Sequence, residues 1–413
     1  MLGQALKLTI QALYFTLIAR SLGVLNYGAF VGVVGLVGIL LPFGPLGSGF
    51  VLIKNVARDQ RLFGENWGIA LSTTICSSLL LFGFVTLLAY FVLPRTIPMQ
   101  LVMFVAASDL FGSSLITISG HAFLAFERTH WTAAINVLLG AARLVAAGVL
   151  VALHGNPSSL EWGRFYFAST SVAAVVAFLL VLTKLGAPVF RFPRAIAEIR
   201  MGLYFSVSQS AQTIYNDIDK AMLARLGTLE ATGIYGAAYR LLDVSFAPVS
   251  SLLVAAYPNF FRVGLAGISA TLRYAKPLIL RALPYATFVS IVVLVGASIV
   301  PHVLGAEYRL SVEAMRWLAV LPMLKAVHYF LSDALAGAGY QSLRTLIHVG
   351  VAFFNILVNL WLIRAYSWRG AAWSSIASDA LLVVLMAVAV FVLSRRSQPA
   401  LAGNERFEAR AEA

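Results

Sequence analysis

This sequence has little cysteine and little charge. Its single cysteine, Cys76, excludes a disulfide framework and a Cys-x-x-Cys redox pair. Charged residues make up 11% of the chain and hydrophobic residues 60%, whereas roughly 25% charged residues are usual in a soluble domain. The mean hydropathy is +0.87, and most apolar stretches reach about 20 residues, enough to cross a hydrocarbon core of roughly 30 Å. The composition therefore predicts a polytopic membrane protein.

Motifs for catalysis, nucleotide binding and metal binding are also missing. The sequence has no Walker A loop, no Gly-x-Ser-x-Gly elbow and no cluster with metal-ligand spacing. We therefore expect no enzyme activity, no catalytic residues, no metal and no cofactor. Without a nucleotide-binding segment, active transport would draw on a gradient of H⁺ or Na⁺, or on the gradient and later metabolism of the substrate.

The net charge of +13 raises the possibility of binding to nucleic acid, but the basic residues are spread through short loops. The loops that follow the even-numbered predicted helices lie on one side of the membrane, and that side carries about twice as many basic residues as the other. By the positive-inside rule, the side with more basic residues is the cytoplasm. This pattern predicts no nucleic-acid partner. It places both termini in the cytoplasm of a multi-pass protein, which we assign to the bacterial inner membrane.

Apolar runs bounded by charge, glycine and proline predict twelve transmembrane helices. All seven tryptophans fall near predicted helix ends, as an interfacial aromatic belt requires. The expected helices are 2–19, 29–53, 67–93, 99–125, 130–153, 161–184, 200–225, 231–261, 277–304, 312–338, 342–363 and 370–394.

The two halves of the chain resemble each other around residues 19–30 and 224–235. Six predicted helices separate the two copies, an even number, so the repeats are parallel. The expected fold is all-α, with two six-helix bundles around a central cavity. The expected parts are an N-terminal bundle (1–184), a basic cytoplasmic linker (185–199), a C-terminal bundle (200–394) and a disordered cytoplasmic tail (395–413).

The second expected helix carries small residues and prolines. Glycines recur three or four residues apart, which is typical of close helix packing in membranes. Pro42 and Pro45 predict a kink in the same helix. The glycines are Gly28, Gly32, Gly35 and Gly38.

The stretch 203–243 carries an unusually polar pattern for so apolar a chain. On a helix, six of its polar residues fall on one stripe about 100° wide. Lipid cannot solvate such a face, so it must contact protein or a water-filled cavity. Asp219 lies off the stripe and is interpreted as structural. The stripe contains Ser206, Gln209, Thr213, Asn216, Asp217 and Lys220.

Two motifs indicate a family. The pattern Ala-Arg-x-Leu-Gly-x-x-x-Tyr-Gly occupies 19–28, and the polar motif at 215–223 is followed by a Gly-x-Tyr-Gly-rich motif at 233–240. Together they resemble the polysaccharide transporter (O-antigen flippase) branch of the multidrug/oligosaccharidyl-lipid/polysaccharide exporter superfamily, over about residues 1–394.

The resemblance implies a bilobed transporter that flips undecaprenyl-diphosphate-linked oligosaccharide, such as an O-antigen, capsule or exopolysaccharide repeat unit, by alternating access. Lipid-linked oligosaccharide, membrane lipids and polysaccharide polymerase machinery are its implied partners.

Nine polar residues inside expected helices are candidates for lining the translocation cavity. Lys220 would attract diphosphate, with Asp217 pairing with it or binding a coupling cation; the alternative is a purely structural pair. The planar guanidinium of Arg240 can bind two phosphate oxygens, or it forms a private pair with Asp243. The candidates are Lys7, Gln11, Arg143, Gln209, Asn216, Asp217, Lys220, Arg240 and Asp243.

Weaker polar stripes support the cavity as well. One expected helix carries Asp109, Ser113, Thr117 and His121. In another, Lys325 lies two turns before Asp333, and we interpret the two as a structural pair.

Two other functions stay open. A cation-coupled multidrug antiporter of the same superfamily would have an acid-dominated cavity, which the buried basic residues argue against. A membrane O-antigen polymerase or ligase typically has a large outer loop with catalytic residues, whereas the outer loops expected here are short.

Overall fold

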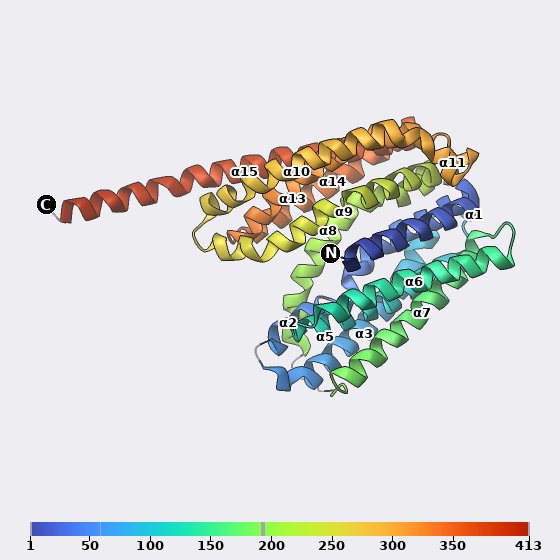
Figure 1. Cartoon of the computed structure of the whole chain (residues 1–413), viewed down its shortest axis with the longest axis horizontal. Helices are drawn as coiled ribbons and strands as arrows, with labels where there is room; N and C mark the ends of the chain where they lie inside the picture. Colours follow the sequence, from blue (N-terminus) through green and yellow to red (C-terminus); the bar gives the residue numbers. More distant parts are fainter. Residues whose placement is uncertain (1, 58, 191–194, 412–413) are drawn as a thin grey trace. The chain divides into compact units, whose positions relative to one another are not determined.

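The computed structural model describes residues 2–57, 59–190 and 195–411, apart from the side chains of 2–8, 195–202, 204–205, 208, 254 and 396–411. The described residues form helices and turns and no strand (Figure 1), which confirms the all-α prediction. The α-helices among the described residues are α1 (Leu2–Leu40), α2 (Ser48–Val56), α3 (Phe63–Val92), α4 (Met99–Ala106), α5 (Ser114–Ala125), α6 (Thr129–Leu153), α7 (Ser159–Lys184), α8 (Ala195–Leu226), α9 (Leu229–Gly264), α10 (Ile268–Gly296), α11 (Val300–Leu304), α12 (Ser311–Leu318), α13 (Leu321–Gly337), α14 (Gln341–Tyr366) and α15 (Trp368–Ala411).

Ten helical stretches in the described residues are long and apolar enough to cross a membrane. The first, Thr9–Val56, has 48 residues, more than twice what one crossing needs, and contains most of the first expected helix and all of the second. α8 is not among the ten. Counting the first stretch as two crossings and adding α8 gives the twelve expected helices, so the prediction of a polytopic membrane protein is confirmed.

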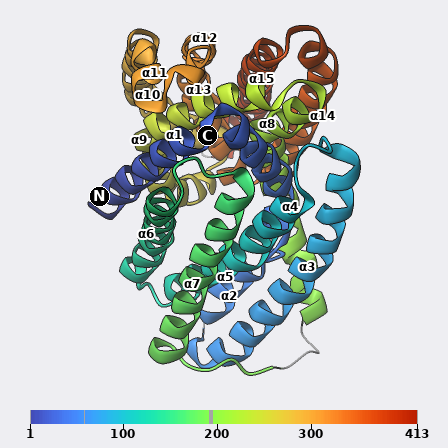
Figure 2. The same ribbon diagram turned by 90° about the vertical axis from the view of Figure 1, so that its right-hand side faces the viewer.

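The chain forms two compact units, each with its own apolar core. The first contains Met1–Ala237, Ile299–Ser311 and Asn359–Ala371, and the second contains Ala238–Ser298, Val312–Val358 and Ala372–Ala413. Within the first, α5, α6 and α7 pack together around a cluster that includes Trp67 and Phe123 (Figure 2). Within the second, α10 packs on α13 around Phe260 and Phe330.

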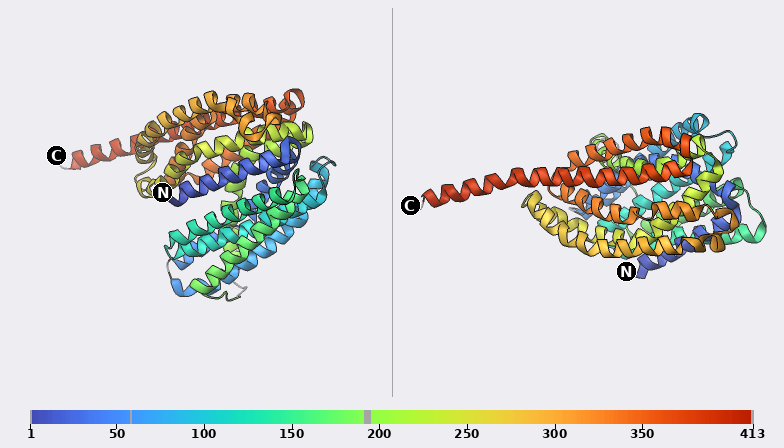
Figure 3. Two further views of the ribbon diagram at one scale, coloured as in Figure 1. Left: turned by 45° about the vertical axis from the view of Figure 1, so that its right-hand side comes forward. Right: turned by 90° about the horizontal axis from the view of Figure 1, so that it is seen from above.

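The expected bundle limits stay predictions. Residues 191–194 of the expected linker lie outside the described residues; just before them, Val189 donates its N–H to the Gly64 carbonyl at 2.8 Å. α15 runs as one helix to Ala411 (Figure 3), past the expected end of the last span. The side chains of the expected tail beyond residue 395 lie outside those described.

Glycines on α1 pack it closely against α8 and the start of α9. A Cβ atom on Gly32 would lie 2.7 Å from the Ala224 Cβ, and one on Gly35 would lie 3.0 Å from the Asp217 carbonyl oxygen. Ser210 of α8 donates to the Ile39 carbonyl at 2.7 Å. The predicted packing role of these small residues is confirmed. We call this contact the glycine seam.

α1 is broken at Gly23, which has φ 68° and ψ 170°. The break leaves the Val24 N–H without its helical acceptor, and the Glu307 carboxylate accepts from it at 3.0 Å. Next to it, the Tyr308 hydroxyl donates to the Ala19 carbonyl at 2.8 Å. Burial raises the pKa of Tyr308, so this hydroxyl keeps its proton. Residues 306–308, between two spans, therefore cap the break in α1.

A second break separates α1 from α2, as the two prolines predict. A short 3-10 turn at Leu41–Phe43 begins it. Leu46 and Gly47 follow with φ values of 44° and 66°, in the left-handed region, and α2 starts at Ser48. The expected second span is therefore a discontinuous helix, a feature that in many transporters accompanies a binding site.

Candidate functional site

The middle of α8 brings three of the predicted residues together. Lys220 Nζ forms an ion pair and a hydrogen bond with Asp217 Oδ1, and it also donates to the Asn216 carbonyl at 3.3 Å. Lys220 is buried, whereas the Asp217 side chain is 37% exposed. Gly35 lets the backbone of α1 approach the Lys220 Cβ, which explains why the lysine is covered and the aspartate is open.

Asp219 has the structural role expected for it. It is fully buried and accepts hydrogen bonds from the Tyr235 hydroxyl and from the Lys220 N–H. Tyr235 is on α9, so this carboxylate ties α9 to α8 beside the glycine seam.

Arg143, on α6, lies in a dense polar network with α7 and a short π-helical turn, η3 (Ala107–Ser113). Its guanidinium lies 3.2 Å from Asp109 Oδ1 and 4.1 Å from the centre of the Tyr166 ring. It also donates to Thr170 Oγ1 at 3.2 Å and to Ser113 Oγ at 3.3 Å. The guanidinium is thus engaged on several sides by its own unit. We call these residues the Arg143 network.

Sequence reasoning missed two of the four partners of Arg143 in this network. Tyr166, whose hydroxyl donates to Asp109 at 2.9 Å, and Thr170 lie one turn apart on α7. Their four-residue spacing marks a shared helix face. Nothing in the sequence says that this face meets α6, so the partners of Arg143 could not be predicted.

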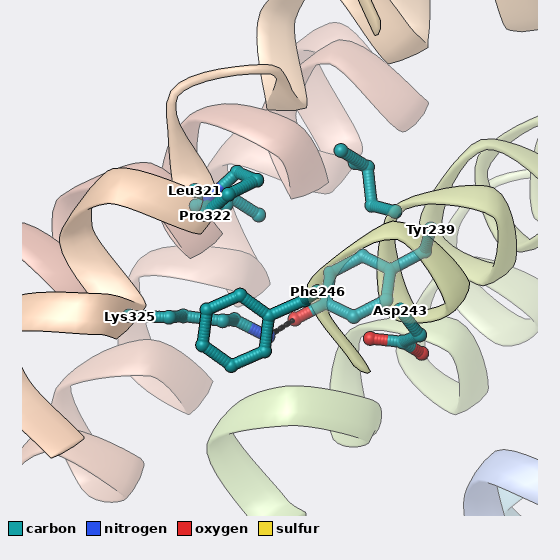
Figure 4. Close-up of a pocket in the computed structure, with 7 residues that line it drawn as sticks. Tyr239, Asp243, Phe246, Leu321, Pro322 and Lys325 are labelled. Atoms are coloured by element: carbon teal, nitrogen blue, oxygen red, sulfur yellow. Dashed lines mark hydrogen bonds between the residues drawn. The ribbon is translucent and has the colours of Figure 1, made fainter. Parts of the chain in front are cut away.

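In the second unit, α9 and α13 line a small pocket (Figure 4). Lys325 Nζ donates to the Tyr239 hydroxyl at 2.9 Å and lies 4.8 Å from the centre of that ring. Asp243 and Phe246 line the same pocket, whose volume of about 10 Å³ is close to the least that holds one water. Lys325 and Tyr239 are both buried. Sequence reasoning missed Tyr239 and Phe246.

Two proposed ion pairs are not formed. Asp333 pairs with Arg344 at 3.8 Å, and the predicted Lys325–Asp333 pair is wrong, because eight residues of helix span roughly 12 Å. Among the residues that the structure describes, Arg240 and Asp243 form no ion pair with each other or with another residue. Arg240 is half-buried and Asp243 is exposed.

Three predicted residues remain, Gln209, Gln11 and Lys7. Gln209 lines a cavity of about 250 Å³ beside the second break of α1, and Gln11 is half-buried on α1. The side chain of Lys7 lies outside those described. Within the described residues, no three His, Cys, Asp or Glu side chains gather as metal ligands would.

Comparisons with known proteins identify relatives of the chain. A family model described as polysaccharide biosynthesis protein matches residues 1–263. An inward closed structure of the lipid II flippase MurJ has a TM-score of 0.71 at 12% identity, covering 94% of this chain and 86% of that one. An inward-facing multidrug resistance transporter of the MATE family, in the MOP superfamily, has a TM-score of 0.66 at 14% identity, covering 94% and 96%. No curated protein sequence matches the chain. At such identities the structural likeness establishes a shared fold.

Proposed function

Because the chain belongs to the polysaccharide biosynthesis protein family, we propose that it is a flippase for undecaprenyl-diphosphate-linked oligosaccharide in the bacterial inner membrane. The fold is shared with a protein whose name is lipid II flippase. The O-antigen, capsule or exopolysaccharide repeat unit would be its cargo, and polymerase machinery would receive it on the outer side.

Arg240 is the observation that supports this proposal. It lies roughly 16 Å from the start of α9, at about 1.5 Å per residue, well inside a stretch able to span the membrane. It is half-buried, and within the described residues it has no ion pair. A charge at that depth is costly unless it serves a pathway or a partner. A diphosphate matches it, because a guanidinium can bind two oxygens at once.

Alternating access would carry the headgroup while the polyprenyl tail stays in lipid. Basic side chains would offset the diphosphate charge. Lys220 is a second candidate for binding the diphosphate, and Asp217 or Asp243 would take up H⁺ or Na⁺ if translocation is coupled to a gradient. No step requires chemical conversion of the cargo, so the proposed protein is not an enzyme.

Restoring surface polysaccharide in a flippase-deficient strain tests the proposal. We expect the wild-type chain to restore it, Arg240→Gln to restore at least tenfold less, and Arg240→Lys to retain part of the activity. Arg262→Gln is the matched control, because Arg262 is exposed near the C-terminal end of the same helix, and it should be fully active.

Drug resistance measured in parallel distinguishes the flippase from the alternative function, a multidrug antiporter, which the structural similarity to a MATE transporter also suggests. Resistance without surface polysaccharide would replace the flippase with a cation-coupled multidrug antiporter. Wild-type polysaccharide levels with Arg240→Gln would refute the role of Arg240.

The proposed topology makes a separate prediction. Reporter fusions at residue 190 and at residue 266, between α9 and α10, should be active only as cytoplasmic reporters, and a fusion at residue 156 only as a periplasmic one. The opposite pattern would invert the assigned direction of transport.

A further inference from the structure

We propose that the cavity beside the second break of α1 is an uncharged subsite for one sugar ring of the cargo headgroup. The inference rests on the proposed function, because it assumes a lipid-linked saccharide as cargo. The cavity has a volume of about 250 Å³ and is lined by the break itself, by α5 and by α8. All of these segments belong to the first unit.

The broken helix is what hollows out this space. A continuous helix through 41–47 would fill it with side chains, whereas the 3-10 turn and the left-handed residues Leu46 and Gly47 turn the backbone aside. Gly47 and Gly49 add no side chains of their own to the wall, and a Cβ on Gly49 would collide with the His121 ring. The break therefore leaves polar residues of α5 and α8 in the wall of the cavity.

Two buried hydroxyls in the wall lack partners. Ser114 and Ser206 are 1% and 2% exposed, and their hydroxyl oxygens have no hydrogen-bond partner among the described residues. A buried hydroxyl without a partner costs about 1–3 kcal/mol. Ligand hydroxyls in the cavity would supply the missing hydrogen bonds, and His121 Nδ1, which also has none in the described part of the chain, offers a third position.

The chemistry of the lining favours a sugar over a phosphate or a drug cation. Among the side chains that the structure describes, no Lys, Arg, Asp or Glu lines the cavity. Its polar groups are hydroxyls, the Gln209 amide and an imidazole, all of which can bind neutral hydroxyl groups. At the rim, the exposed Phe50 ring lies 4.9 Å from the His121 ring, and it can pack against the apolar face of a sugar ring.

The volume limits what fits. At about 30 Å³ per water molecule, the cavity holds the equivalent of roughly eight waters. This is room for one sugar ring and not for a whole repeat unit. Gln209, Thr117 and Phe50 are exposed at the mouth, so further sugars would extend outward past them.

Equilibrium binding to the purified full-length chain in nanodiscs tests the subsite. The probes are undecaprenyl diphosphate without sugar and the same lipid carrying a single glucose, galactose or N-acetylglucosamine. We expect at least one sugar-bearing lipid to bind about tenfold more tightly than the bare lipid, as one or two net hydrogen bonds to the sugar would give. In Ser206→Ala/Gln209→Leu this preference should vanish while binding of the bare lipid is unchanged.

The control variant, Thr183→Ala/Gln100→Leu, also replaces one hydroxyl residue by alanine and one glutamine by leucine, at exposed helical positions away from the cavity, and it should keep the preference. Because Ser206→Ala/Gln209→Leu removes no charge and little volume, its binding of bare lipid reports that it is folded. Equal wild-type affinity for all four lipids, or a preference that survives Ser206→Ala/Gln209→Leu, would refute the subsite and leave the flippase standing. Failure to bind any of the lipids would refute both.

Discussion

Two arginines, Arg143 in the first unit and Arg240 in the second, differ in how many partners their guanidinium groups have among the described residues. Arg143 in the first unit has a carboxylate, two hydroxyls and an aromatic face around one guanidinium. In the second unit, Arg240 has no ion pair within the described residues. A cation whose donors are already engaged holds helices together, whereas one with donors to spare can take a ligand. We therefore propose a structural role for Arg143; its role in the cavity, which the sequence analysis expected for it as for Arg240, stays a prediction.

The largest effect on stability is expected from breaking the Arg143 network on one side. Arg143→Gln leaves Asp109 as a buried carboxylate without its cation, and we expect a loss of about 3 kcal/mol in the free energy of unfolding. Denaturant unfolding of the purified protein in detergent measures it. Replacing both partners by apolar residues, in Arg143→Met/Asp109→Leu, should recover most of the loss. If the double variant loses as much free energy of unfolding as Arg143→Gln and Asp109→Leu lose together, the Arg143–Asp109 pair is not the source of the loss.

A smaller effect is expected at the α9–α13 contact. Tyr239→Phe removes the hydroxyl that accepts from Lys325 and leaves the ring in place, so it should cost about 1.5 kcal/mol in the same unfolding assay. Tyr257→Phe, at an exposed position of α9, is the control and should change nothing measurable. If Tyr239→Phe lowered the free energy of unfolding as much as Arg143→Gln does, the expected difference between the two contacts would be contradicted.

The smallest effect on stability is expected on α8, where translocation should respond instead. The Asp217–Lys220 pair is three residues apart on one helix and partly exposed, so Asp217→Asn should cost less than about 1 kcal/mol. Lys220→Gln should likewise leave folded protein in the membrane but lower the restoration of surface polysaccharide several-fold. If Lys220→Gln restored surface polysaccharide to the wild-type level, the Asp217–Lys220 pair would be structural.

Local geometry explains which of these features the sequence could predict. Residues three apart on one helix share a face, so the Asp217–Lys220 pair was predictable. Side chains eight residues apart on one helix are too far from each other for an ion pair, so the predicted Lys325–Asp333 pair was wrong. The kink at Pro42 and Pro45 and the packing role of the glycines likewise depend on local backbone chemistry. The partners of Arg143 depend on which helix faces meet, and a single sequence does not contain that information. The cavity at the second break was missed because proline predicts a kink but not the residues that it uncovers.

The glycine seam has a consequence for the order in which the chain is made. Gly32 packs on Ala224, which lies about 190 residues later, so at about 5–20 residues per second the ribosome needs roughly 10–40 s to supply it. During that interval the seam side of α1 has no α8 to pack against. Lipid must cover it first and be displaced when α8 arrives. A bulky residue at Gly32 would therefore obstruct a late docking step of assembly and leave the first insertion of α1 into the membrane unaffected.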